Sequence, residues 1–147
     1  MIYREEVQNL FTVPEEYCLC QCISADFKMG KGIALGFNQH YNMKNRLTMK
    51  YPCYLQTWDE MGGLGDCLYD NCVFNLITKR NYWEKPTYQT ITTALQKMHH
   101  MIVYAGITKL AMPKIGCGLD RLNWDKVREI VQDIFKDTDV EILVCMQ

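Results

Sequence analysis

The chain has 147 residues with 16 Lys and Arg against 17 Asp and Glu, so its formal net charge is -1. This length predicts one domain over residues 1–147, and 48% apolar with 22% charged residues excludes a disordered chain. The near-neutral charge argues against a protein that binds nucleic-acid backbones mainly by charge. No apolar run is long enough to span a bilayer, so we expect no membrane partner.

Strands and helices alternate along the chain. A helix is expected from Ile33 to about Tyr41, followed by a short helix and irregular chain over 43–63. Pro86 marks the start of a helix with an apolar stripe that ends at Tyr104, and Asn123 caps a helix that reaches Phe135. A turn at Asp70-Asn71 predicts a hairpin. The expected strands cover residues 2–6, 17–24, 65–69, 72–78, 109–112 and 140–145.

This alternation predicts an α/β fold in which helices cover both faces of a mixed, largely parallel sheet. Ligands of such sheets bind at the carboxyl ends of strands. Two glycine-bearing loops follow expected strands, one from Ser24 to Gly32 and one from Pro113 to Asp120. We therefore expect the functional site where these loops meet.

The first of these loops contains Gly30-Lys31-Gly32 directly before a helix. Glycines there let backbone N–H groups approach an anion, which the helix dipole also favours. The segment matches neither the Walker A nor the Rossmann pattern, and from spacing alone a tight turn explains it equally well. Together with the second loop it could hold a diphosphate.

Lys79 stands at the carboxyl end of an apolar strand, where a solvated lysine is the ordinary interpretation. A lysine nucleophile must first lose its proton, which burial or a neighbouring cation such as Arg80 would favour. Asp120 alone would be an ordinary loop carboxylate. His40, His99 and His100 show no metal-ligand spacing, and we assign them no role.

The eight cysteines raise the question of disulfides or zinc. The N-terminus lacks a basic flank followed by an apolar run, so we expect no secretory signal and a cytoplasmic location, with a nuclear one left open. We therefore expect reduced thiols, and without any CxxC pair we expect no metal. Cys18, Cys20 and Cys22 alternate, so on a strand they would share one buried face. The absence of heptads or repeats favours a monomer.

Three segments together resemble the macro domains. Residues 22–34 (CISADFKMGKGIA) resemble the first ligand loop of that family. Residues 76–79 (LITK), 85–88 (KPTY) and 112–124 (MPKIGCGLDRLNW) resemble the branch of the terminal ADP-ribose protein glycohydrolase and its bacterial DNA-directed relatives. The similarity extends from about residue 2 to the C-terminus.

The resemblance implies a three-layer α/β/α macro domain that binds ADP-ribose and needs no cofactor. Lys79 would attack the anomeric carbon of the distal ribose, and Asp120 would act as acid and base. Leu10 and the C-terminal residue would border the adenosine. The other implied substrate-binding residues are Ser24, Ala25, Asp26, Met29, Gly30, Gly32, Ile33, Ala34, Thr78, Pro113, Lys114, Ile115, Gly116, Cys117, Gly118 and Leu119.

The implied partners are ADP-ribose and a protein or nucleic acid that carries it. The bond cleaved stays open among an acidic side chain, an acetyl ester and a DNA base, and two alternatives are a non-catalytic ADP-ribose reader and an ADP-ribose 1''-phosphate phosphatase. Many macro domains carry Gly-Asp-Leu near the N-terminus, where the aspartate contacts the adenine amino group, but this chain has Gln8-Asn9-Leu10. Asn9 accepts through its carbonyl without the charge, so we expect weaker selection for adenine.

Overall fold

Six strands form one sheet in the order β1-β6-β5-β2-β4-β3. All neighbours pair in parallel except β3 and β4, which are antiparallel. This computed structural model describes residues 1–146, so the predicted contact of Gln147 with adenosine lies outside the described residues. The strands are β1 (Ile2–Val7), β2 (Cys18–Ser24), β3 (Asp66–Asp70), β4 (Val73–Lys79), β5 (Lys109–Met112) and β6 (Glu141–Met146).

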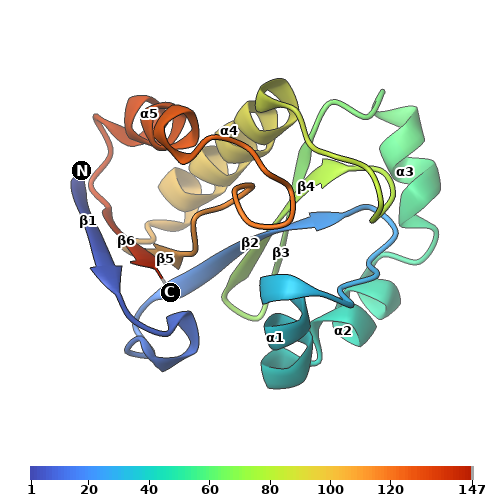
Figure 1. Ribbon diagram of the computed structural model, residues 1–147, viewed down its shortest axis with the longest axis horizontal. Coiled ribbons are helices and arrows are strands. Elements are labelled where there is room, and N and C mark those ends of the chain that lie inside the picture. The colour runs from blue at the N-terminus through green and yellow to red at the C-terminus, as the bar shows by residue number, and fades with distance from the viewer. Residues whose placement is uncertain (147) are drawn as a thin grey trace.

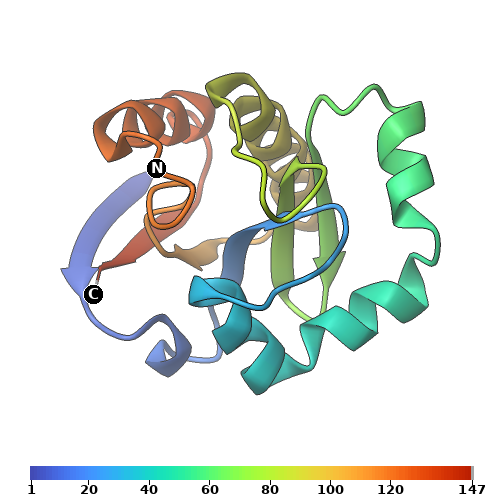
Figure 2. The ribbon, with the colours of Figure 1, turned by 45° about the vertical axis from the view of Figure 1, so that its right-hand side comes forward.

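Helices cover both faces of the sheet, as Figures 1 and 2 show. One face packs against α4 and α5, and the other packs against η1, α1, α2 and α3, so that two separate apolar clusters form the core. The helices are η1 (Leu10–Thr12), α1 (Gly32–Tyr41), α2 (Met43–Lys50), α3 (Tyr54–Glu60), α4 (Tyr88–Ala105) and α5 (Trp124–Phe135). The predicted three-layer α/β/α fold with a mixed, largely parallel sheet is confirmed. Among residues 1–146, no helix has both the length and the apolar character of a membrane span.

The central strand β2 shows why alternation matters. Cys18 and Cys20 lie in the apolar cluster under α4 and α5, whereas Leu19 and Ile23 lie in the cluster on the other face. The predicted shared face of the alternating cysteines is therefore confirmed. Because both faces of β2 are covered, its side chains are almost all buried.

One cysteine prediction is wrong. Cys18 and Cys72 form a disulfide across the start of β2 and the turn before β4, with Cα atoms 4.9 Å apart. Sequence spacing does not reveal this pair, because 54 residues separate the two cysteines and only the pairing of β2 with β4 brings them together. The other six cysteines are free thiols.

Helix ends follow their capping residues. The Thr87 side chain accepts a hydrogen bond from the Thr90 amide and forms a capping box at the start of α4, just after Pro86. The Asn123 side chain accepts from the Asp125 amide, so the predicted cap of α5 is confirmed.

Three local expectations need correction. Two helices, α2 and α3, occupy much of 43–63, where one was expected. The hairpin turn consists of Asn71 and Cys72, both with positive φ, one residue later than predicted. Tyr104 is 89% exposed and lies outside the buried stripe of α4, because the apolar spacing of that stripe ends at Ile102.

Candidate active site

The carboxyl ends of the parallel strands β2, β4 and β5 place three loops at one edge of the sheet. The loop after β2 is joined to the segment after β4 by the Ala25 amide, which donates to the Lys79 carbonyl at 2.9 Å, and by the Asp26 amide, which donates to the Arg80 carbonyl at 3.2 Å. These two segments lie side by side in Figures 1 and 2. The predicted meeting place of the loops is therefore present.

The two glycine loops also approach one another. A Cβ atom placed on Gly32, the first residue of α1, would lie 3.3 Å from Leu119 Cδ1 in the loop after β5. Lys85 reaches the same loop, and its Nζ donates to the Leu119 carbonyl at 2.7 Å. The loop from Ser24 to Gly32 thus faces the loop from Pro113 to Asp120.

Lys79 and Asp120 form an ion pair at this edge. The Nζ atom of Lys79 lies 2.7 Å from Oδ1 of Asp120 and also donates to the Tyr82 carbonyl at 3.2 Å. The two side chains are only 12% and 14% exposed. The structure thus brings together the amine and the carboxylate that the sequence proposed, at distances that permit proton transfer between them.

The loop after β2 leaves space and donors for an anion. Lys31 is the N-cap of α1, and no side chain of residues 1–146 caps the first turn of that helix. A Cβ atom on Gly30 would meet no other atom of these residues within 4 Å, so the backbone there borders open space. Phe27 and Met29 are buried under α1–α3 and fix the loop to that layer.

Of the other predicted residues here, Ser24 and Ala25 are buried, whereas Ile33 and Ala34 are partly exposed on α1.

The loop after β5 requires glycine at position 116. Gly116 has φ +72°, and a Cβ atom there would lie 2.9 Å from Ile91 and 3.0 Å from Leu122. Ile115 is buried in the cluster under α4 and α5, which fixes this loop to the opposite layer from the first one. The outer residues Lys114, Gly118 and Leu119 are exposed, and Pro113 and Cys117 are partly exposed.

Two predicted residues lie beneath this edge or beside it. Thr78 precedes Lys79 on β4, and its hydroxyl oxygen is buried and has no hydrogen-bond partner among residues 1–146. Leu10 is buried in η1, after the carboxyl end of β1. The Asn9 side chain caps η1 by accepting from the Phe11 amide at 2.9 Å, so its carbonyl already has a protein donor.

Cys22 and the Tyr82 carbonyl were not predicted as neighbours of the ion pair. Burial raises the pKa of the Cys22 thiol, and the nearby Asp120 carboxylate raises it further. Burial likewise raises the pKa of Cys117 to about 11, so both thiols stay protonated at neutral pH. The alternating cysteines correctly predicted the face of β2 on which Cys22 lies. Its place next to the Lys79–Asp120 ion pair depends on the tertiary position of Asp120, which has no local sequence signal.

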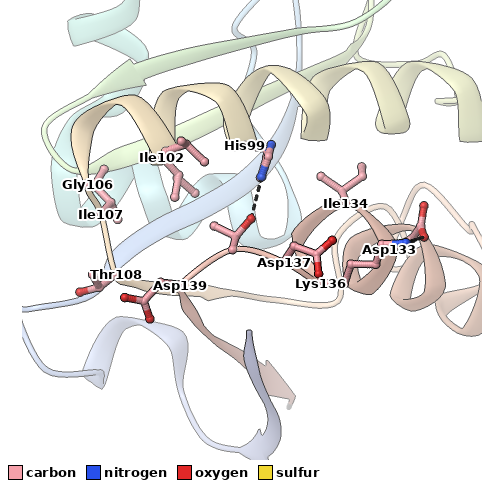
Figure 3. A pocket seen from close by; sticks show the side chains of 12 residues that line it. His99, Ile102, Gly106, Ile107, Thr108, Asp133, Ile134, Lys136, Asp137 and Asp139 are labelled. Atoms are coloured by element: carbon pink, nitrogen blue, oxygen red, sulfur yellow. Dashed lines mark hydrogen bonds and ion pairs between the residues drawn. The ribbon is translucent and has the colours of Figure 1, made fainter.

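A cavity of about 680 Å³ lies at the opposite edge of the sheet, between the C-terminal ends of α4 and α5 (Figure 3). It borders Thr108 and Asp139, which precede β5 and β6. There the His99 ring lies 2.7 Å from the Thr138 hydroxyl. None of the predicted site residues lines this cavity, so it is separate from the candidate active site.

No family model matches the chain. The chain is similar to the ADP-ribose glycohydrolase OARD1 of Bos taurus, with 36% identity over 137 residues that cover 92% of this chain and 86% of that protein. The macrodomain of Thermus aquaticus DarG has a similar fold, with a TM-score of 0.77 and 24% identity over 98% of this chain and 97% of that one.

Thermosipho africanus DarTG, solved in complex with ADP-ribose, also shares the fold, with a TM-score of 0.63 and 18% identity over 90% of this chain and 39% of that one. These two structures establish the fold, and the identity with OARD1 extends over most of both proteins. The chain therefore belongs to the macro-domain family that includes the ADP-ribose glycohydrolase OARD1.

Proposed function

We propose that this protein is a hydrolase that binds ADP-ribose and removes it from a modified protein side chain, acetyl ester or nucleic-acid base. The observation that carries the proposal is the 2.7 Å contact between Lys79 Nζ and Asp120 Oδ1, at the edge where two glycine loops face each other. The similarity to OARD1, whose name describes an ADP-ribose glycohydrolase, supports the same reaction class.

The reaction begins with the transfer of a proton from the Lys79 ammonium to Asp120. The free amine attacks the anomeric carbon of the distal ribose, and the bond from that carbon to the leaving group breaks. The leaving group departs with the bonding electrons and takes the proton from Asp120. The bond from the anomeric carbon of the lysyl–ADP-ribose adduct to its ring oxygen then breaks, and a proton moves from the nitrogen to that oxygen, which leaves a protonated Schiff base. Water adds to the same carbon and passes a proton through Asp120 to the nitrogen. The carbon–nitrogen bond then breaks, which releases ADP-ribose and restores the lysine.

The two loops would hold the rest of the ligand. The uncapped amide groups at the start of α1 suit the negative diphosphate, and the open space beside Gly30 lets it approach the backbone. These features support binding of a polar, anionic ligand next to the lysine.

A release assay tests the proposal. ADP-ribose released from Glu- and Asp-modified protein and from base-modified DNA is measured for the wild type, Lys79→Ala and Asp120→Asn. We expect each variant to lose about 100-fold or more in kcat. Lys97→Ala is the matched control, because it removes a lysine from a different ion pair, with Asp66 at 3.4 Å. Full activity of Lys79→Ala would overturn the lysine mechanism, and wild-type binding without release would indicate the reader.

The phosphatase alternative gives a different result in the same series. A water-based reaction on ADP-ribose 1''-phosphate would survive the loss of Lys79 but not the loss of Asp120. Reductive trapping separates the two mechanisms directly, because borohydride reduces a Schiff base to a stable amine. We expect mass spectrometry to find ADP-ribose fixed to the peptide that contains Lys79.

A further inference from the structure

We propose that Asp26 is a positioning residue for the lysine, rather than a direct contact of the substrate. It holds the turn 81–84 in place, and the Tyr82 carbonyl of that turn fixes the direction of the Lys79 amine. This inference rests on the proposed function, because it assigns a role within the same reaction.

The Asp26 carboxylate is already occupied by protein donors. Its Oδ1 accepts from the Ser24 hydroxyl and from the Lys28 amide at 3.1 Å, and its Oδ2 accepts from the Tyr82 amide at 2.9 Å. A carboxylate placed against a diphosphate would also repel it. Its geometry and its charge therefore both favour a role within the protein.

Tyr82 transmits the effect of Asp26 to the lysine. The amide of Tyr82 donates to Asp26, and the carbonyl of the same residue accepts from Lys79 Nζ at 3.2 Å. One residue thus separates the carboxylate from the amine. The 81–84 turn is closed at its other end by Glu84, whose side chain accepts from the Asn81 amide at 2.7 Å.

Two acceptors are needed to give the amine a fixed direction. A single contact with Asp120 would leave the flexible lysine side chain free to rotate about that bond. The second contact, with the Tyr82 carbonyl, restricts this rotation. A small displacement of a reacting atom costs about 100-fold in rate, so the position of the turn should appear in kcat.

Asp26→Asn tests the inference with little change in shape. The amide of the new side chain keeps one oxygen for the Ser24 and Lys28 donors, but it presents an NH₂ group to the Tyr82 amide and so loses that bond. We expect kcat for ADP-ribose release to fall about 10- to 100-fold. The Kd for ADP-ribose should stay within about threefold of the wild-type value. A residue that only positions the lysine changes kcat, whereas a residue that contacts the substrate would also change Kd.

Glu84→Gln is the matched control. It removes one negative charge from the same turn but keeps an oxygen that can accept from the Asn81 amide. We expect kcat and Kd to stay within about threefold of the wild type. An equal loss of kcat in Glu84→Gln would mean that charge, not position, explains the effect. A rise in Kd with an unchanged kcat in Asp26→Asn would show a substrate contact. Either result overturns the inference.

Two further measurements keep the inference testable. Asp26→Ser, which replaces the carboxylate with a shorter hydroxyl, is a second variant. Once circular dichroism shows that it is folded, we expect the same loss of kcat as in Asp26→Asn. Hydrogen exchange of the Tyr82 amide needs no activity: we expect protection in the wild type and Glu84→Gln, and loss of it in Asp26→Asn. An unprotected wild-type amide overturns the inference. A wild type that releases no ADP-ribose refutes the proposed function instead, and exchange still decides whether Asp26 holds the turn.

Discussion

Lys79 and Asp120 are 41 residues apart in the chain, yet Nζ of the lysine lies 2.7 Å from Oδ1 of the aspartate. Neither side chain is more than 14% exposed, so each charge has little contact with water. Removing one partner leaves the other charge partly buried and unpaired. Loss of either partner alone should therefore lower the free energy of unfolding.

A double-mutant cycle measures this contribution. Lys79→Ala and Asp120→Ala should each lower the free energy of unfolding, and the double variant should lose less than the sum of the two. We expect a coupling energy of about 1–3 kcal/mol. Urea unfolding of the four proteins gives the value. A coupling energy near zero would show that the ion pair is absent in solution.

Gly116→Ala should destabilise the protein and weaken ADP-ribose binding. The residue has a positive φ, and its new Cβ atom would meet Ile91 at 2.9 Å. We expect a loss of about 1–3 kcal/mol in the free energy of unfolding. Gly118→Ala is the control for stability, since a Cβ atom there meets no atom of the described part of the chain within 4 Å. Equal stability of the two variants in urea would contradict the expected clash with Ile91.

Glu5 makes stability depend on pH at the acidic end. Hydrogen bonds from Arg128, with smaller ones from Tyr3 and Trp124, lower the pKa of the Glu5 carboxyl from 4.5 to about 2. A group with a lowered pKa stabilises the fold fully above its unfolded value and loses that contribution as the pH falls through its folded value. The free energy of unfolding of the wild type should therefore exceed that of Glu5→Gln by up to about 3 kcal/mol at pH 7, and the difference should shrink between about pH 4.5 and pH 2.

Glu129→Gln, an exposed residue of α5, controls for the general effect of acid on this helix. Thermal unfolding at a series of pH values measures both differences. If the Glu5→Gln difference stayed constant from pH 7 to pH 2, the Arg128 contact would not explain the lowered pKa.

The disulfide between Cys18 and Cys72 predicts a thiol count. Six thiols should react in the denatured protein without reductant and eight after reduction. Because the bond closes a loop of 54 residues, its loss should lower the free energy of unfolding by about 4 kcal/mol or less. Cys72→Ala should show the same loss without reductant. Eight reactive thiols before reduction would show that the bond does not form.

The periodic parts of the fold could be predicted from the sequence. The predictions that depend on local patterns are the cap at Asn123, the helix start near Pro86, the buried strand 17–24 and the order of strands and helices. The structure confirms them. The second helix within 43–63 lacked such a signal, because its start at Cys53 has a positive φ and no side-chain cap.

The candidate site could be predicted only in part. Strand ends placed Lys79 and the glycine loops at one edge, and the resemblance to macro domains added Asp120. Contacts that depend on tertiary structure had no sequence signal. The Tyr82 carbonyl beside Lys79 belongs to the backbone, which any residue could supply, and Cys72 meets Cys18 only through strand pairing.

The two glycine loops are anchored on opposite sides of the sheet, one by Phe27 and Met29 and the other by Ile115. A molecule held by both loops would therefore link the two apolar layers on opposite faces of the sheet. Its binding free energy should slow the local opening of α1 and of α4 together, although these helices share no core. In this protein the ligand would act as a structural cross-link between layers as well as a reactant.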